Sequence, residues 1–137
     1  MRYIKSCGFI VFTVLGGERR YLIIKSHNGD VGFPKGHVEE GESEIETALR
    51  ELMEETGVDV RVIDGFRRRL EYELPDTPDA MKEVVYFLGE CLRPETLTPQ
   101  ESEVAEATFL PFADALSLLT FEQTRRLLFE AEEFITR

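Results

Sequence analysis

The sequence predicts a layered α/β domain. Short segments rich in Val, Ile, Phe and Tyr alternate with segments of helical periodicity, and this interleaving is typical of sheets covered by helices. The chain has 137 residues, of which 42% are hydrophobic, enough for one packed core. No repeat, low-complexity tract or interdomain linker interrupts the sequence. We therefore expect a single domain over residues 1–137.

The N-terminal part is expected to form a hairpin followed by a loop. Residues 2–15 contain the apolar run GFIVF and predict a largely buried strand. Gly16 and Gly17 supply a turn, and residues 20–25 (RYLIIK) predict the return strand. Residues 27–36 are punctuated by glycine and proline, which indicates a loop leading into a helix.

That helix carries clear signals at both ends. Ser43 and Glu46 form a capping box, so the helix should begin at Ser43. Gly57 stands where a helix favours a left-handed C-terminal residue. Apolar or small residues between them recur at three- and four-residue steps and predict one buried stripe: Ile45, Ala48, Leu49, Leu52 and Thr56.

The second half of the chain alternates strands and loops before two C-terminal helices. Strands are expected at 58–63, 66–74, 81–92 and 105–110, and loops at 74–80 and 94–102. Helices are expected at 112–118 and 121–135. The second helix should bury an apolar face made of Phe121, Leu127, Leu128, Ala131 and Phe134.

Composition excludes several classes of function. The net charge is −11, and residues 39–55 contain eight of the glutamates and one arginine, while no basic stripe indicates a reader of polymeric nucleic acid. The densest basic cluster, Arg67 to Arg69, is expected at a solvated strand edge, with a phosphate contact as the alternative. The sequence contains no signal peptide or membrane-spanning run, so we expect a soluble, cytoplasmic protein without membrane contact. Nothing indicates an obligate protein partner.

The two cysteines are consistent with the expected cytoplasmic location. Cys7 and Cys91 each lie within an apolar run, and no other soft ligands are near them in sequence. We expect both to be reduced core residues rather than a disulfide or a zinc site.

Three glutamates near the end of the predicted helix form a candidate metal site. Glu51 and Glu55 are four residues apart and Glu54 is three from Glu51, so all three lie on neighbouring parts of the helix surface. Clustered oxygen ligands suit a hard cation such as Mg2+ or Mn2+. Carboxylates at a helix C-terminus oppose the helix dipole, so local stability does not explain them. A solvated acidic face is the alternative, and we prefer it for Glu39, Glu40, Glu44 and Glu46.

Residues 36–58, GHVEEGESEIETALRELMEETGV, resemble the Nudix box, the signature of hydrolases that cleave nucleoside diphosphates linked to a further group. Leu52 and Val58 fill its aliphatic positions, and its fixed polar and glycine positions are Gly36, Glu42, Arg50, Glu51, Glu54, Glu55 and Gly57. The resemblance implies a Nudix fold, with a mixed central β-sheet sandwiched between α-helices and the box as a loop–helix–loop on one side.

The resemblance also implies roles for residues of the box. Glu51 and Glu55 would be metal ligands most directly, with Glu54 close behind and Gly36 as a further member of the metal site. Arg50 would orient a ligand carboxylate. The resemblance assigns both Arg50 and Glu54 to the catalytic residues. The Glu55→Gln substitution is expected to abolish turnover and leave the fold intact, since Glu55 is expected at a partly exposed site.

The general base lies outside the box in many Nudix enzymes. The segment TPQESEVAEATFL offers Glu101, Glu103 and Glu106. We favour Glu103, because its position six residues before Phe109 resembles a glutamate of the dinucleoside tetraphosphate hydrolase subgroup. The alternative is that all three belong to an exposed loop and edge strand.

Four further segments resemble asymmetrical diadenosine tetraphosphate hydrolases: GFPKGHVEEGE, MKEVVYFL, SCGFIVF and GFRRRLEYEL. Carried over by position, the resemblance implies polyphosphate contacts from Lys35, His37, Lys82 and Tyr86. Lysines suit phosphate oxygens as point charges, and Lys82 and Tyr86 share a face of one predicted strand. Ordinary roles as surface lysines, a loop histidine and a core tyrosine are the alternatives.

The residue that stacks on the nucleobase is left open. The aromatic candidates are Phe33, Phe66, Tyr72 and Tyr86. The family often places a tryptophan two residues before the proline of the PKGH segment, whereas this chain has none and carries Phe33 directly before Pro34.

The resemblance therefore implies a Mg2+-dependent hydrolase, with Mn2+ as a substitute, that converts diadenosine tetraphosphate to ATP and AMP. A small-molecule nucleotide is its expected partner. Alternative substrates are oxidised dNTPs, diphosphoinositol polyphosphates, ADP-ribose and RNA 5′ ends. A Nudix module that binds a nucleotide without cleaving it is a further alternative, against which the intact carboxylates argue.

Overall fold

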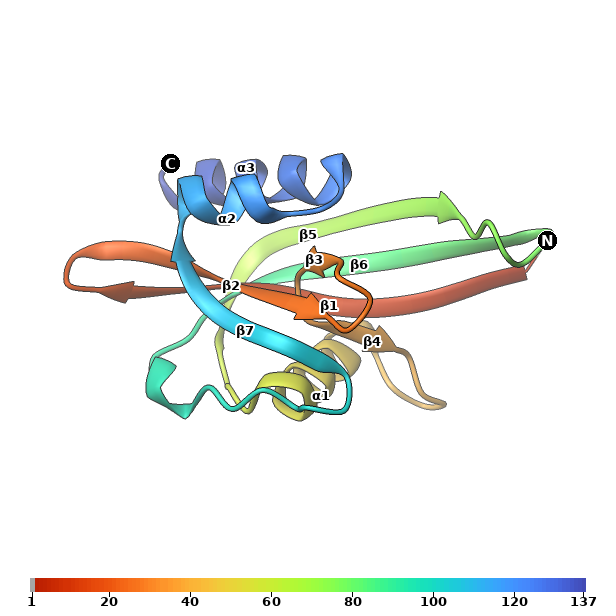
Figure 1. Cartoon of the computed structure of the whole chain (residues 1–137), viewed down its shortest axis with the longest axis horizontal. Helices are drawn as coiled ribbons and strands as arrows, with labels where there is room; N and C mark the ends of the chain where they lie inside the picture. The colour runs from red at the N-terminus through yellow and green to blue at the C-terminus, as the bar shows by residue number, and fades with distance from the viewer. Residues whose placement is uncertain (1) are drawn as a thin grey trace.

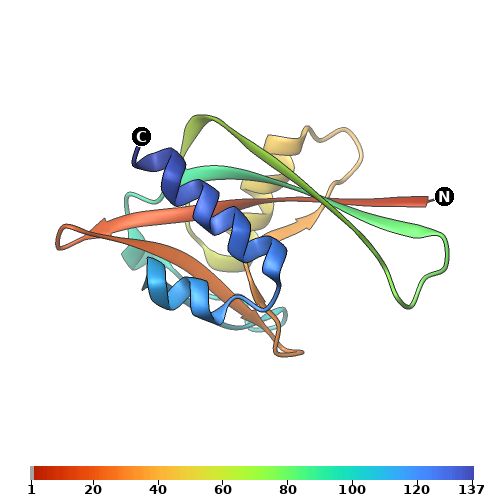
Figure 2. The same ribbon diagram turned by 90° about the horizontal axis from the view of Figure 1, so that it is seen from above.

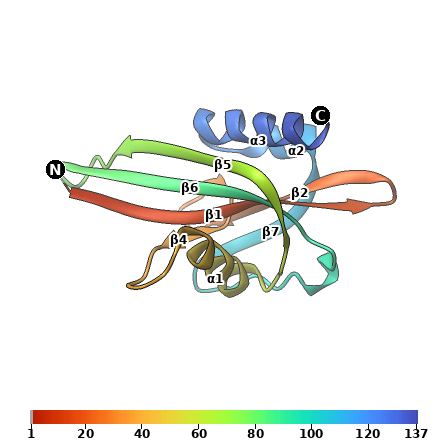
Figure 3. The ribbon, with the colours of Figure 1, turned by 180° about the vertical axis from the view of Figure 1, so that it is seen from behind.

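The computed structural model describes residues 2–137, which form a seven-stranded mixed sheet with helices on both faces (Figure 1). The strands are β1 (Arg2–Leu15), β2 (Glu18–Ser26), β3 (Val31–Gly32), β4 (Lys35–His37), β5 (Arg61–Glu73), β6 (Ala80–Glu90) and β7 (Val104–Pro111). The helices are α1 (Glu44–Thr56), α2 (Phe112–Leu118) and α3 (Glu122–Ile135), with a 3-10 turn at Pro94–Thr96. Helix α1 covers one face, and α2 and α3 cover the other, as the view from behind also shows (Figure 3). The expected fold class is confirmed.

Two segments differ from the sequence prediction. Residues 27–36, expected as a loop, contain β3 and the start of β4. Strand β4 can pair with β1 because position 8 is glycine: a Cβ at Gly8 would lie 2.2 Å from the Pro34 carbonyl oxygen. The segments 58–63 and 66–74, expected as separate strands, belong largely to the single strand β5, whose register with β6 is irregular between Val62 and Arg67.

The sheet forks where β1 meets both β2 and β4. The opposite edge of β1 pairs with β6 in parallel from Arg2 to Phe12. The edge of β1 at the fork pairs with β2 at residues 12–15 and with β4 at residues 6–8. Strand β2 then continues away from β1 to pair with β7 and β3. The fork between β2 and β4 therefore opens beside the Phe33–Pro34 segment.

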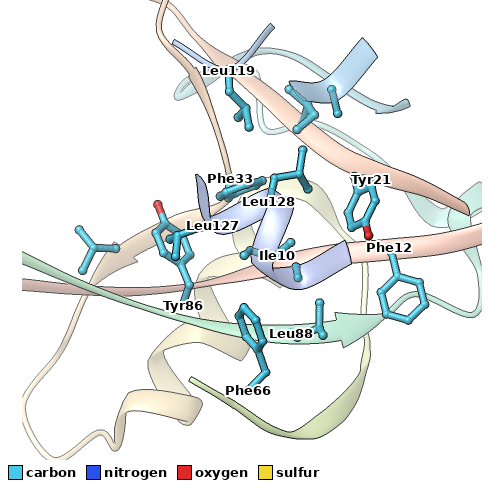
Figure 4. Packing of buried hydrophobic residues seen from close by; sticks show 14 residues of the cluster. Ile10, Phe12, Tyr21, Phe33, Phe66, Tyr86, Leu88, Leu119, Leu127 and Leu128 are labelled. Atoms are coloured by element: carbon cyan, nitrogen blue, oxygen red, sulfur yellow. The ribbon is translucent and has the colours of Figure 1, made fainter. Parts of the chain in front are cut away.

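Alternating side chains of β1 pack into two hydrophobic cores. Cys7, Phe9 and Val11 lie in the core beneath α1, to which this helix contributes Leu52. Ile10 and Phe12 lie in the core beneath α3, whose contributions to it include Leu127, Leu128 and Ala131 (Figure 4). The view from above shows α3 crossing this face of the sheet (Figure 2). Both cysteines are free and buried, as expected.

The predicted helix caps are confirmed. The Ser43 hydroxyl accepts from the Glu46 N–H, the Glu46 side chain accepts from the Ser43 N–H, and Gly57 is left-handed with φ 72°. The expectation for Phe121 is wrong: it precedes α3 and is 54% exposed, because the apolar face of the helix begins beyond it.

The Arg67 to Arg69 cluster lies on edge strand β5, as expected, but its side chains are paired rather than simply solvated. Arg67 pairs with Glu44, Arg68 with Glu130, and Arg69 with Glu71 and Glu83. No helix within residues 2–137 is long and apolar enough to cross a membrane.

Candidate active site

Arg50 is the centre of an ion-pair network on α1. Its Nε donates to Glu42 Oε2 at 2.6 Å, and its Nη1 donates to Glu51 Oε1 at 3.0 Å and to Glu54 Oε2 at 3.2 Å. Its Nη2 donates to the main-chain carbonyl of His37 at 3.0 Å. Arg50 therefore joins the helix to β4 and fixes the position of the Glu51 carboxylate.

The network also shows a role for Glu42 that was not expected from the sequence. Glu42 accepts from Arg50, from the Thr47 hydroxyl at 2.8 Å and from the Glu39 N–H at 3.0 Å. These donors hold the pKa of Glu42 well below its usual range, at about 2, with the Arg50 hydrogen bond as the largest cause. Its fixed position in the box was the available signal.

Gly36 lies directly beneath the Glu51 carboxylate. A Cβ at position 36 would lie 1.9 Å from Glu51 Cδ, so no other residue fits there without moving the acid. This contact brings the main chain of β4 and the side chain of α1 to one point, which is the arrangement expected if Gly36 lies beside a ligand carboxylate.

Glu55 is buried, not partly exposed as expected from the sequence. It is 7% exposed, and its Oε1 has no hydrogen-bond partner within the described residues. Burial, reinforced by the charge of Glu51, raises the pKa of Glu55 to about 8, against the opposing effect of Lys35. A buried carboxylate oxygen without a donor is costly unless a cation or a donor meets it, so Glu55 fits a metal ligand.

Glu54 does not join Glu51 and Glu55 in a three-carboxylate group. Its side chain is 53% exposed and accepts from Arg50. Among residues 2–137, no three His, Cys, Asp or Glu side chains already stand close enough together to hold a metal ion. The donors that fit a hard cation are thus Glu51 and Glu55, with Glu54 at the periphery.

The loop that carries Glu103 is attached to the end of α1. The Thr98 N–H donates to the Thr56 carbonyl at 2.7 Å, and the Gln100 N–H donates to the Glu55 carbonyl at 2.9 Å. The charge of Glu103 contributes to raising the pKa of both Glu51 and Glu55. The structure therefore brings Glu103 within electrostatic range of the two acids.

The other two acids of that segment are placed differently. The Glu101 carbonyl accepts from His27 Nε2 at 2.6 Å, and Glu106 lies on β7 opposite Lys25. Neither is among the main charges acting on Glu51 and Glu55.

Lys35, His37 and Lys82 form a group of basic side chains on the face of the sheet opposite α1. The charges of Lys82 and Lys35, together with burial, lower the pKa of His37. Burial and the charge of Lys35 lower the pKa of Lys82 to about 8. Lys82 is 8% exposed, and neither lysine pairs with a carboxylate in the described part of the chain. Unpaired, partly desolvated ammonium groups suit a polyanionic ligand.

A cavity of about 640 Å³ adjoins these groups. Glu55 and Lys35 lie in its wall, whereas Glu51, His37, Lys82 and Glu103 do not. Tyr86 also lines it and packs edge-on against Phe33, with ring centroids 5.5 Å apart (Figure 4). Tyr86 is 2% exposed, and burial raises its pKa, so the hydroxyl stays protonated.

Two exposed aromatic rings line the same cavity. Among the four stacking candidates, Phe33, Phe66 and Tyr86 are at most 3% exposed, which leaves Tyr72 at 38%. The second exposed ring is Phe121, which the sequence pattern assigned to the buried face of a helix. A flat ligand could stack on either ring.

A family model described as NUDIX domain matches residues 6–131. The chain belongs to the Nudix family. It is 33% identical to the asymmetrical bis(5′-nucleosyl)-tetraphosphatase of Mus musculus, and the alignment covers 96% of this chain and 95% of the mouse protein. The counterpart in Rattus norvegicus is 34% identical with the same coverage.

Solved structures agree on the Nudix fold. The C. elegans Ap4A hydrolase, crystallised as a binary complex, superposes with a TM-score of 0.88 over 97% of this chain and 98% of its own, at 23% identity. The NUDIX domain of Shewanella oneidensis NrtR, crystallised with ADP ribose, gives a TM-score of 0.75 at 20% identity, covering 98% of this chain and 90% of its own.

Proposed function

We propose that this Nudix protein hydrolyses dinucleoside polyphosphates and converts diadenosine tetraphosphate to ATP and AMP. The strongest support is that Glu55 of the box and the unpaired Lys35 lie in the wall of one cavity, with Glu51 within electrostatic range of Glu55 and Lys82 within electrostatic range of Lys35. The chain that builds this cavity aligns nearly end to end with asymmetrical bis(5′-nucleosyl)-tetraphosphatases. A substrate with four phosphates and two bases needs both a cationic strip and aromatic surfaces, and the cavity region offers both.

Glu51 and Glu55, with Gly36 beside them and Glu54 at the periphery, would hold a divalent cation, for which we propose Mg2+ with Mn2+ as a substitute. The unpartnered Glu55 Oε1 and the close contact of Gly36 with Glu51 support this assignment. When bound, such a cation neutralises charge on phosphate oxygens and increases the acidity of water.

The remaining residues divide the work of binding and proton transfer. Lys35, His37 and Lys82 would hold the phosphates, and the Tyr86 hydroxyl would donate a hydrogen bond to a phosphate oxygen. Glu103 would take the proton of the attacking water. Water attacks the phosphorus that becomes part of AMP. The bond from this phosphorus to the bridging oxygen breaks, and ATP leaves with that oxygen.

Tyr72 and Phe121 supply the aromatic surfaces for a base. Both rings are exposed within the cavity wall, and a base stacked on an aromatic ring gains about 1–3 kcal/mol. We also propose a cytoplasmic location, which the free cysteines Cys7 and Cys91 support.

The test is a product analysis. Purified protein is incubated with Mg2+ and a panel of nucleotides, including diadenosine tetraphosphate, ADP-ribose and oxidised dGTP, and the products are separated by ion-exchange chromatography. We expect ATP and AMP in equal amounts, with oxygen-18 from labelled water in AMP. Formation of ADP alone, or preferential cleavage of another nucleotide, would reject the assignment. Reactions with EDTA provide the metal-free control.

A further inference from the structure

The segment that joins α2 to α3 is fixed to β3 by a reciprocal pair of hydrogen bonds. The Val31 N–H donates to Thr120 Oγ1 at 2.7 Å, and the Thr120 N–H donates to the Val31 carbonyl at 3.1 Å. We call this pair the Thr120 latch. Val31 is in the wall of the cavity, so the latch connects the linker directly to that wall.

The linker is held on its other sides as well. Leu119 is 2% exposed and points into the core beneath α3 (Figure 4). Arg125 Nη1 donates to the Leu119 carbonyl at 2.7 Å, and the Thr124 hydroxyl donates to the Phe121 carbonyl at 2.8 Å. The main chain on both sides of Thr120 is therefore tied down, although Thr120 itself lies at the surface.

Phe121 directly follows Thr120, and the contacts described above fix the main chain at its position. Its ring is 54% exposed and lines the cavity. A large aromatic ring gains little from folding at that exposure, so packing within the chain does not account for its placement. A ring held rigidly at a cavity wall is prepared for a planar ligand, because less freedom is lost when the ligand binds.

We propose that Thr120 is a positioning residue for nucleotide binding: its hydroxyl, by accepting from Val31, fixes Phe121 in the orientation that receives a base. This inference rests on the proposed function for the identity of the ligand. The two hydrogen bonds of the latch involve none of the acids and lysines assigned to the phosphates, so the latch acts on the base through Phe121. Its loss should therefore weaken binding of substrate and transition state alike, which raises KM and leaves kcat unchanged.

The chain offers a closely matched set of variants. Thr120→Val has nearly the same shape and removes the acceptor, whereas Thr120→Ser keeps the hydroxyl. For Thr120→Val we expect KM for diadenosine tetraphosphate to rise about 3- to 10-fold at constant kcat, as for one lost hydrogen bond. Thr120→Ser should behave like the parent protein. A Thr120→Val variant with unchanged KM, or with a lower kcat at unchanged KM, would overturn the inference.

A double-variant cycle separates positioning from general loosening. In a Phe121→Ala background, Thr120→Val should have no further effect on KM, because the ring that it positions is gone. Independent additive losses would show that Thr120 acts by another route.

Amide hydrogen exchange tests the latch without any enzyme assay. Exchange at the Val31 amide should quicken in Thr120→Val and not in Thr120→Ser, and equal exchange in the two variants would refute the latch. If the parent protein cleaves no dinucleotide yet this exchange difference is present, the proposed substrate fails while the latch itself stands. The cycle is then read from the dissociation constants of whichever nucleotide in the panel binds, and an unchanged constant in Thr120→Val rejects the positioning role.

Discussion

Glu51 rests on Gly36: a Cβ added at position 36 would lie 1.9 Å from Glu51 Cδ and 2.2 Å from its Oε2. The two residues come from β4 and α1, and Arg50 joins the same elements by donating to both Glu51 and the His37 carbonyl. The position of the acid is therefore set jointly by a missing side chain and by a guanidinium, and each can be tested separately.

Gly36→Ala should displace the Glu51 carboxylate. We expect at least a roughly 100-fold loss of turnover, since a displaced ligand disturbs the charge that acts on the phosphates, together with destabilisation of about 1–3 kcal/mol from overpacking. Steady-state kinetics with Mg2+ and urea unfolding measure the two effects. Gly32→Ala is the control for stability, because a Cβ there meets nothing within 4 Å. Equal stability of the two variants would contradict the close contact.

Arg50→Met should loosen both Glu42 and Glu51. Its side chain is 23% exposed and has several carboxylate partners, so we expect a loss of about 2 kcal/mol in stability and about 10- to 100-fold in activity. Arg50→Lys should recover only part of either, because one ammonium cannot replace the planar fork. Arg126→Met, at an exposed arginine 3.6 Å from Glu122, is the matched control and should change neither.

Glu55→Gln should abolish turnover while preserving the fold, because it removes the charge of a buried carboxylate and keeps its shape. We expect the variant to unfold at the same or a higher temperature than the parent in EDTA, because burial raises the pKa of Glu55 to about 8 and the amide does not carry this cost of burying an acid. Mg2+ should raise the unfolding temperature of the parent and much less that of the variant. Calorimetry in EDTA and in Mg2+ measures both, and equal stabilisation by Mg2+ would remove Glu55 from the proposed ligand set.

Tyr72→Ala should weaken nucleotide binding through lost stacking. We expect KM to rise about 5- to 100-fold with little change in kcat, whereas Tyr72→Phe, which keeps the ring, should stay near the parent value. Tyr3→Ala, at another exposed tyrosine outside the cavity wall, is the control. If Tyr72→Phe were as impaired as Tyr72→Ala, the hydroxyl rather than the ring would be the important group.

Lys82→Met should weaken substrate binding and raise the stability of the folded protein, and the gain in stability should depend on pH. Burial and Lys35 lower the pKa of Lys82 from 10.5 to about 8 in the folded protein. Between these two values the unfolded chain binds more protons, so stability rises with pH across this window and the destabilisation is fully present below it. We expect the variant to unfold at a higher temperature than the parent at pH 7, and the gain to shrink as the pH rises towards 10.

Thermal unfolding from pH 7 to pH 10 follows the stability of Lys82→Met, and KM at pH 7 should rise because a phosphate contact is lost. Lys25→Met, at an exposed lysine, is the control. A stability gain that does not change with pH would contradict the lowered pKa.

The local parts of the fold could be predicted from the sequence. The predicted ends of helix α1 agree with the structure, because Ser43, Glu46 and Gly57 act on their immediate neighbours. The common face of Lys82 and Tyr86 followed from strand alternation alone. The family was evident from the box, since its fixed residues serve contacts that span only a few helical turns and one strand.

The fork of the sheet could not be predicted, because it depends on pairing between distant residues. Strand β4 forms where Gly8, far away in sequence, leaves room for the Pro34 carbonyl. Phe121 looked like part of an apolar stripe, and only the path of the linker past Val31 turns it to the cavity. Glu103 could be chosen only by resemblance, since the attachment of its loop to α1 runs through main-chain atoms.

The parallel pairing of β1 with β6 has a consequence for how the molecule assembles. It joins Arg2 to Ala80 and Phe12 to Glu90, so the central ladder closes only after most of the polypeptide has been made. Such distant contacts carry a large loop-closure entropy, and we expect slow folding, on the millisecond-to-second scale of sheet-rich topologies. Until β6 emerges from the ribosome, the apolar GFIVF run of β1 lacks the strand that pairs with every one of its residues, and a nascent chain is most prone to aggregate during that interval.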